Sequence, residues 1–184
     1  MLFEIERLSV RVLERNDAAL LAKWLSNPTV LQYYEGRDHP FDIDKVKKVF
    51  FDKETDVNRC IIEFKGVAIG YIQYYQLDKE TQLLYGYPIV APVTIYGIDQ
   101  FIGEENYWDQ GIGQLLIRSM VKFLMKHKQA NKIVMDPQTW NLRALRCYEK
   151  CGFRKIKLLS NHELHEGKYR DCWLIEFTKD ASIS

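Results

Sequence analysis

The sequence of 184 residues has no long apolar run, only four cysteines and no excess of charge of either sign. No stretch approaches the roughly 20 apolar residues that span a bilayer, so we expect no membrane segment and no membrane partner. The chain carries 26 lysines and arginines against 25 acidic residues, a balance that argues against binding to nucleic acid. Residues 1–7 lack the basic-then-apolar order of an export signal, which predicts a cytoplasmic protein.

The cysteines do not form a disulfide framework, and we expect them to be reduced. They are Cys60, Cys147, Cys151 and Cys172. Cys147 and Cys151 would share a helix face, but no second pair of ligands follows nearby, so we interpret them as small apolar residues. His162 and His165 do not have the spacing of zinc proteases, and we expect them on a loop or at the surface. The sequence therefore predicts no metal site.

The length fits one domain, and the apolar fraction of 47% is enough to fill its core. Residues 8–12 alternate between apolar and polar, which predicts a strand. Apolar residues at helical spacing predict a helix over 18–25, ended by Asn27-Pro28. A second helix is expected to include residues 43–50, after Asp42 as its N-cap. The first part of the chain is thus one strand followed by two helices.

Three further strands are expected before the next helix. Residues 59–64 and 67–77 are rich in β-branched and aromatic side chains, and Lys65-Gly66 between them predicts a hairpin turn. A third extended segment, residues 93–102, follows a loop marked by Pro88 and Pro92. These strands form the antiparallel half of a predicted sheet.

The pattern then changes to alternating helices and strands. An amphipathic helix is expected over 113–128, and a short strand over 132–135. Another helix runs from its cap at Asn141 to Gly152, and a polar loop separates closing strands over 153–159 and 169–178. Strands first and strand-helix units later predict an α+β fold with a mixed, mostly antiparallel sheet flanked by helices.

The sharpest local motif is the glycine-rich turn from Asp109 to Gln114, between a predicted strand and a predicted helix. Glycines let the backbone direct several N–H groups to one point, and the start of the helix adds its positive dipole end. Such a turn fits a pyrophosphate, but an ordinary strand-to-helix turn has the same residues. The motif alone leaves both interpretations open.

A second motif, from Asn141 to Phe153, combines a capped helix with Tyr148 one turn beyond Ala144. Together the two motifs resemble the GNAT superfamily of N-acetyltransferases, and the resemblance covers essentially the whole chain. It implies the GNAT fold with splayed central strands, and acetyl-coenzyme A as cosubstrate.

The resemblance also implies the coenzyme contacts. Backbone N–H groups of the turn would hold the pyrophosphate: Gln110, Gly111, Ile112, Gly113 and Gln114. The strand end at Phe101 and Ile102 would bond the pantetheine arm, Asn141 would bond its amides beside Ala144, and Tyr148 would lie near the sulfur. One residue departs from the family pattern, because Trp108 stands where arginine or glutamine is usual.

A narrower resemblance follows from Tyr96 to Gly103 and from Asn106 to Trp108. These segments are similar to aminoglycoside 6′-N-acetyltransferases, especially to the acetyltransferase half of bifunctional acetyltransferase/phosphotransferase resistance enzymes. No kinase activity is expected. The implied function is antibiotic resistance by acetylation of the 6′-amine of kanamycin-type substrates.

The chemistry of a polycationic substrate agrees with this function. Its attacking amine is mostly protonated at neutral pH, so the site needs anions and a base. Asp99 is the expected base, directly or through water, and Tyr148 the expected acid that protonates the leaving thiolate. Transfer would be direct, without an acyl-enzyme intermediate.

Further side chains are candidates for substrate binding. Asp136 ends a strand beside that of Asp99, and is the second carboxylate of the expected site. Outer acids and tyrosines that would pack on sugar rings complete the set: Glu104, Glu105, Glu163, Asp171, Tyr34, Tyr74 and Tyr96.

Two other functions fit the same motifs. One is acetylation of a protein N-terminus or another metabolite amine, which would require a peptide-sized groove without gathered acids. The other is a non-catalytic acyl-coenzyme A-binding module. The sequence also leaves open which aminoglycosides are preferred, whether hydroxyls are acetylated, and whether the protein is a monomer or a dimer.

Overall fold

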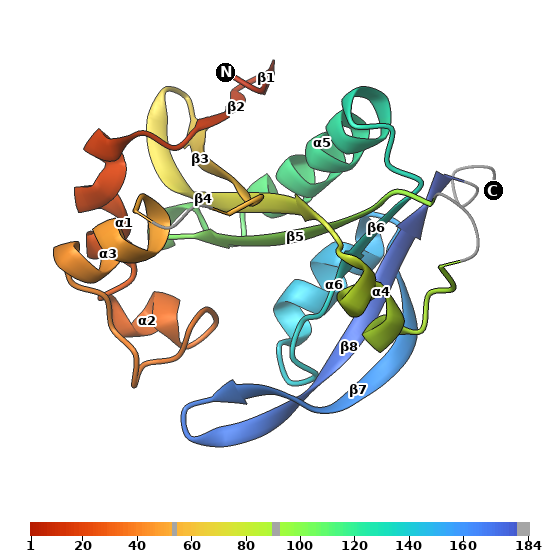
Figure 1. Ribbon diagram of the computed structural model, residues 1–184. Coiled ribbons are helices and arrows are strands. Elements are labelled where there is room, and N and C mark those ends of the chain that lie inside the picture. Colours follow the sequence, from red (N-terminus) through yellow and green to blue (C-terminus); the bar gives the residue numbers. More distant parts are fainter. Residues whose placement is uncertain (53–54, 90–92, 180–184) are drawn as a thin grey trace. The chain divides into compact units, whose positions relative to one another are not determined.

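The computed structural model describes residues 1–52, 55–89 and 93–179. Within these residues, eight strands are hydrogen-bonded in the order β1-β2-β3-β4-β5-β6-β8-β7 (Figure 1). The first pairs are antiparallel, β5 and β6 are parallel, and β6 and β8 are antiparallel. The mixed sheet predicted from the sequence is therefore present. No helix in the described part of the chain has the length and apolar character needed to cross a bilayer.

The chain divides into two compact units. The first contains residues 1–73, 99–113 and 165–168, and the second contains residues 74–98, 114–164 and 169–184. Strands β4 and β5 contribute residues to both units, so each unit is described by its own contacts.

The strands of the first unit come mainly from the N-terminal part of the chain. They are β1 (Phe3–Ile5), β2 (Leu8–Val12), β3 (Asn58–Phe64), the first part of β4 (Val67–Gln76) and the end of β5 (Ile95–Ile102). Lys65 and Gly66 both have positive φ, of 51° and 76°, as the predicted tight hairpin turn requires.

Three helices, shown from red to orange in Figure 1, lie together beside the β3–β4 hairpin in this unit. They are α1 (Ala18–Trp24), α2 (Pro28–Leu31) and α3 (Ile43–Phe50). The Asp42 carboxylate accepts the Lys45 N–H at 2.7 Å, which confirms the predicted cap of α3. Pro28 does not simply end the preceding helix, because it is the first residue of α2, where a missing N–H costs nothing.

The core of the first unit is aromatic. Trp24, Tyr71 and Phe101 are buried, and the Tyr71 and Phe101 rings stack at 5.7 Å. Aliphatic side chains of the three helices and of Leu25, which follows α1, fill the space around them: Leu21, Leu25, Leu31 and Val46. Because Phe101 lies on β5, this core fixes the strand that carries the candidate catalytic residue.

The second unit contains the remaining helices and strands. They are α4 (Lys79–Tyr85), α5 (Ile112–His127, most of which lies in this unit), β6 (Lys132–Met135), α6 (Leu142–Lys150), β7 (Arg154–His165) and β8 (Lys168–Thr178). One cluster of its buried core contains Leu77, Ile95, Val134, Leu159, Cys172 and Leu174. Parallel pairing joins Ile95–Gly97 of β5 to Lys132–Val134 of β6, so β6 lies beside the strand of Asp99 as expected.

Several parts of the fold differ from the expectations or stay open. The sequence analysis did not predict β1, α2 or α4. The polar loop predicted before β8 is much shorter than expected: His162 and His165 belong to β7, and His165 is buried. Pro92 lies outside the described residues, so the expectation for that part of the loop stays a prediction.

Candidate functional site

The glycine-rich turn has the backbone shape that an anion cradle requires. Asp109 and Gly111 both have positive φ, of 57° and 77°, and α5 begins immediately afterwards at Ile112. Within the described chain, no atom lies within 4 Å of a Cβ placed on Gly111, so the glycine is needed for its φ and not for lack of space. The first N–H groups of a helix have no carbonyl partner inside it. The residues from Gln110 to Gly113 therefore fit a pyrophosphate group.

The end of β5 is held from two directions in the first unit. The buried Phe101 ring contacts Tyr34 at 4.7 Å between centroids and Tyr71 on the strand beside it. The Ile102 carbonyl accepts a hydrogen bond of 2.8 Å from the Trp108 indole N–H. The residue that departs from the family pattern thus has a structural task, because it ties the glycine-rich turn to the strand end.

The α6 motif has the predicted cap. The Asn141 side-chain oxygen accepts a hydrogen bond of 3.2 Å from the Ala144 N–H. The NH₂ group of the same side-chain amide can therefore donate to a ligand. Tyr148 is buried one turn further on, with its ring 6.3 Å from that of Phe153. Both side chains are thus fixed by contacts inside the second unit.

Asp99, on β5, belongs to a chain of hydrogen bonds that the sequence analysis did not find. The Gln73 amide donates to the Asp99 carboxylate at 2.8 Å, and the Tyr71 hydroxyl donates to the Gln73 oxygen at 2.7 Å. Burial raises the pKa of Tyr71, so its hydroxyl remains a donor. This arrangement fixes the orientation of the Asp99 carboxylate. Tyr71 and Gln73 stand two apart on β4, and this period of two was the available signal.

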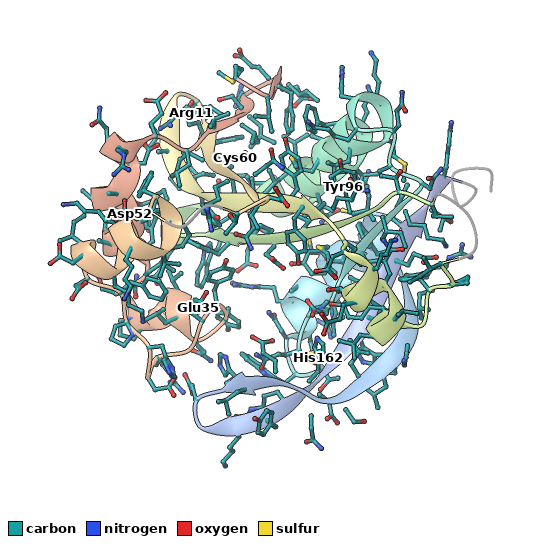
Figure 2. The ribbon with its side chains drawn as sticks, in the orientation of Figure 1. Arg11, Glu35, Asp52, Cys60, Tyr96 and His162 are labelled. Carbon is teal, nitrogen blue, oxygen red and sulfur yellow. The ribbon has the colours of Figure 1, made fainter. Side chains whose placement is uncertain are left out.

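Asp136 accepts two hydrogen bonds on one oxygen in the second unit. The Tyr85 hydroxyl donates to it at 3.0 Å, and the His162 Nε2 lies 2.8 Å away. The hydrogen bond with Asp136 raises the pKa of His162. His162 belongs to the long β7–β8 hairpin (Figure 2). Neither partner of Asp136 was among the predicted site residues.

The outer acids have other partners. Glu104 accepts hydrogen bonds from Lys23 and from the Trp24 indole, and these two donors lower its pKa. Asp171 is exposed and accepts the Asn161 N–H at 2.8 Å. The Glu105 carboxylate accepts a hydrogen bond from the Asn27 amide, and the Glu163 carboxylate accepts one from the Cys172 thiol. Because Glu104 already neutralises Lys23, it is a weaker candidate for a cationic substrate than Asp99 or Asp136.

The three candidate tyrosines differ in accessibility. Tyr34 and Tyr96 are partly buried, whereas Tyr74 is 3% exposed and packs edge-on against Phe123 at 5.8 Å. The expectation that Tyr74 packs on a sugar ring is wrong for this structure, because its faces are covered by the protein. Tyr34 and Tyr96 stay as candidates.

No group of three or more His, Cys, Asp and Glu side chains in the described ranges is arranged to hold a metal ion. The four cysteines are free thiols. Cys151 is buried, with its thiol 3.6 Å from the Gln114 carbonyl, and the hydrogen bond with Cys147 lowers its pKa.

Comparison with known proteins connects this site to a family. Residues 14–160 match the acetyltransferase (GNAT) domain. An aminoglycoside N(6′)-acetyltransferase type 1 of Klebsiella pneumoniae is 27% identical over 161 residues, which cover 82% of this chain and 75% of that protein.

Solved structures agree with this match. The crystal structure of the aminoglycoside acetyltransferase AAC(6′)-Ib in complex with coenzyme A and kanamycin has a TM-score of 0.73 and 25% identity, and the alignment covers 95% of this chain and 96% of the other. A spermidine N-acetyltransferase from Vibrio cholerae has a TM-score of 0.77 at 16% identity, with 97% and 99% covered. The second likeness concerns the fold alone.

Proposed function

Since the chain belongs to the GNAT family of acetyltransferases, we propose that it transfers an acetyl group from acetyl-coenzyme A to the 6′-amine of a kanamycin-type aminoglycoside and thereby confers resistance. The observation that carries the proposal is the oriented carboxylate of Asp99, on β5 of a chain that matches aminoglycoside acetyltransferases over most of its length. Kanamycin and coenzyme A are the ligands of one such relative.

The coenzyme is held mainly by backbone groups. The N–H groups from Gln110 to Gln114 bind the pyrophosphate, and the dipole of α5 adds to their attraction for negative charge. The end of β5 at Phe101 and Ile102 bonds the pantetheine arm as an added strand would. Asn141, beside Ala144, donates its side-chain amide hydrogens to the arm.

Asp99 orients the substrate ammonium and accepts its proton, directly or through a water molecule. The hydrogen bond from Gln73 holds the carboxylate in place for this transfer. The neutral amine attacks the thioester carbonyl, so a C–N bond forms and the C–S bond breaks. Tyr148 protonates the departing thiolate, and the proton that the new amide nitrogen loses restores the Tyr148 hydroxyl. No covalent enzyme intermediate is formed.

Asp136 supplies the second negative charge for the polycationic substrate. Tyr34 and Tyr96 offer partly exposed rings to its sugars, and Glu104, Glu105, Glu163 and Asp171 add weaker attraction at the periphery. This division follows the contacts of each side chain, because Asp99 and Asp136 each face neutral or titratable donors, whereas Glu104 faces a lysine.

The test is thiol release from acetyl-coenzyme A, with kanamycin compared with an analogue that has a hydroxyl in place of the 6′-amine. We expect release with kanamycin only, and a loss of kcat of about 10²–10⁴-fold in Asp99→Asn. Asp44→Asn, on the exposed side of α3, is the matched control and should retain the wild-type rate. Expression in a susceptible bacterium should raise the inhibitory concentration of kanamycin.

Two results would count against the proposal. Equal release with the hydroxyl analogue would exclude the 6′-amine as the acceptor, and a wild-type rate in Asp99→Asn would exclude Asp99 as the base. Coenzyme binding without any release would favour another amine substrate or a binding module.

A further inference from the structure

Asp136 is the centre of a hydrogen-bonded group that draws on three separate elements. Tyr85 comes from the end of α4, Asp136 follows β6, and His162 comes from the middle of β7. Both donors bond the same carboxylate oxygen, at 3.0 Å and 2.8 Å. The rings of Tyr85 and His162 lie 6.1 Å apart. The three side chains thus form one connected group rather than two unrelated contacts.

The group is partly shielded from water. The His162 side chain is 21% exposed and that of Asp136 is 31% exposed. A charge on one therefore acts on the other through a medium that screens less than bulk water. At the same time both remain accessible enough to exchange protons and to meet a ligand.

The charge of this group depends on the proton of His162. With a neutral imidazole, Asp136 keeps its full negative charge and still accepts a hydrogen bond. With an imidazolium, the two charges cancel, and an incoming ammonium competes with His162 for the same oxygen. From this geometry we propose that His162 is a positioning residue that sets the charge Asp136 presents to a cationic substrate, so that substrate binding weakens when His162 is protonated.

This inference rests on the proposed function, because it takes Asp136 as a binding group for a substrate amine. It adds a residue, His162, that was not among the predicted site residues. From the sequence, His162 was expected only to lie on a loop or at the surface.

The surrounding charges favour the imidazolium form of His162. Glu163 on β7 adds to the attraction of Asp136 and helps to raise the pKa of His162. Other titratable groups of these elements include Tyr85, whose hydroxyl donates to Asp136, and Cys172 and Asp171 on β8. Burial raises the pKa of Cys172, and the negative charges of Glu163 and Asp136 raise it further, so this thiol stays neutral. Lys157 bonds the Leu84 carbonyl at the end of α4.

The direction of the pH dependence follows from the sign of the charge. Above the raised pKa of His162, the imidazole is neutral and substrate binding is strong. Below it, the imidazolium forms and the KM for kanamycin rises. In His162→Gln the amide still donates to Asp136 but does not titrate, so the KM of this variant lacks the extra rise.

The experiment measures KM and kcat for kanamycin between pH 5.5 and 8.5 in wild type and in His162→Gln. Because the substrate amines titrate in the same way with both proteins, the informative quantity is the ratio of the two KM values. We expect the ratio of wild type to variant to rise roughly tenfold toward low pH, as for loss of one charge-assisted hydrogen bond, with a constant ratio of kcat. His39→Gln, in an exposed loop, is the control and should give a ratio near one throughout.

Two additional measurements separate the possible outcomes. In His162→Ala the KM should exceed that of wild type above the pKa of His162, because the donor that positions Asp136 is gone, and should lack the extra rise at low pH, because no imidazolium forms. NMR titration of the His162 ring should show a lower pKa in Asp136→Asn than in wild type. A flat KM ratio in an active enzyme would overturn this inference alone. If the wild type neither acetylates kanamycin nor binds it in calorimetry, both this inference and the proposed function are overturned.

Discussion

Arg11, Asp17 and Glu63 form a hydrogen-bonded charged group in the first unit. Two Arg11 nitrogens donate to the Asp17 carboxylate, each at 2.8 Å, and its Nε donates to Glu63 at 2.7 Å. Asp17 is buried and also accepts the Glu14 N–H. Burial alone raises the pKa of Asp17, but the Arg11 and Glu14 hydrogen bonds outweigh it and leave the pKa below its usual range. The folded state therefore favours the charged form of Asp17.

Replacing this carboxylate tests its contribution. Asp17→Asn leaves Arg11 without half of its partners, and we expect a loss of about 2 kcal/mol in unfolding free energy at pH 7, less than for a fully buried pair because Arg11 is partly exposed. A carboxyl with a lowered pKa stabilises the fold above its unfolded value, about 3.9, and this stabilisation is lost as the pH falls through the folded value. The difference between wild type and variant, measured by urea unfolding, should therefore shrink between pH 5 and pH 3.

Asp52→Asn is the matched control for this prediction. Its pair with Arg15 is 3.3 Å long and both side chains are more than half exposed, so removing it should change the unfolding free energy little. Equal losses in the two variants would mean that the Asp17 network has no special role.

At the scale of elements, local chemistry was a good guide wherever a segment buries one face. The period of two in β2, the positive φ that Gly66 allows, and the caps of α3 and α6 all follow from neighbouring residues. In contrast, α4 has no buried residue, so it lacks the apolar stripe from which a helix is predicted. Its only signals are the Asp78 cap and Gly86 with a φ of 85°.

The residues of the candidate site likewise fall into those that neighbouring residues predict and those that they do not. The coenzyme motifs are short segments, so their caps and turns were visible in the sequence. The partners of the two carboxylates are distant in the chain: Gln73 is 26 residues from Asp99, and Tyr85 is 51 residues from Asp136. Only the pairing of strands and the packing of α4 bring such residues together. For this reason the acids were predicted, whereas the side chains that orient them were not.

Substitutions of Gly111, in the glycine-rich turn before α5, can show whether coenzyme binding depends on the positive φ of this residue or on the space that its missing side chain leaves. Gly111→Ala adds a Cβ where φ is positive, a strain of about 1 kcal/mol, which should weaken coenzyme A binding about fivefold. Gly111→Asn also adds a Cβ, but asparagine tolerates this conformation far better, so it should retain most of the affinity. Calorimetric titration with coenzyme A measures both. Equal weakening would show that the added Cβ obstructs the ligand, rather than that φ matters.

At the scale of the whole molecule, the chain contributes sequence-distant segments to each unit. Residues 165–168, the turn of the β7–β8 hairpin, belong to the first unit, whereas most of the hairpin belongs to the second. The contact that holds the turn joins residues 129 apart: Arg37 donates to both Glu166 carboxylate oxygens and its backbone N–H donates as well. Burial contributes little there, since both side chains remain in contact with water.

Loss of this ion pair should release the hairpin turn without unfolding either core. In Glu166→Gln we expect faster amide hydrogen exchange at residues 165–168 and in the Tyr33–Arg37 loop, whereas the buried strands should exchange as in wild type. Glu149→Gln removes an exposed pair with Lys155 and is the control, which should leave exchange at the turn unchanged.

The pH and salt dependence identify the ion pair as the cause. The hydrogen bonds from Arg37 lower the pKa of Glu166 to about 2, so the pair stays charged from pH 8 down to pH 4 and is lost only as the pH falls through that value. The difference in exchange between wild type and Glu166→Gln, corrected for the intrinsic pH dependence, should therefore be the same at pH 5 and pH 8. High salt should reduce the difference by screening the exposed charges of the wild type. If the turn exchanges equally in both proteins at low salt, backbone hydrogen bonds of the hairpin alone hold it in place.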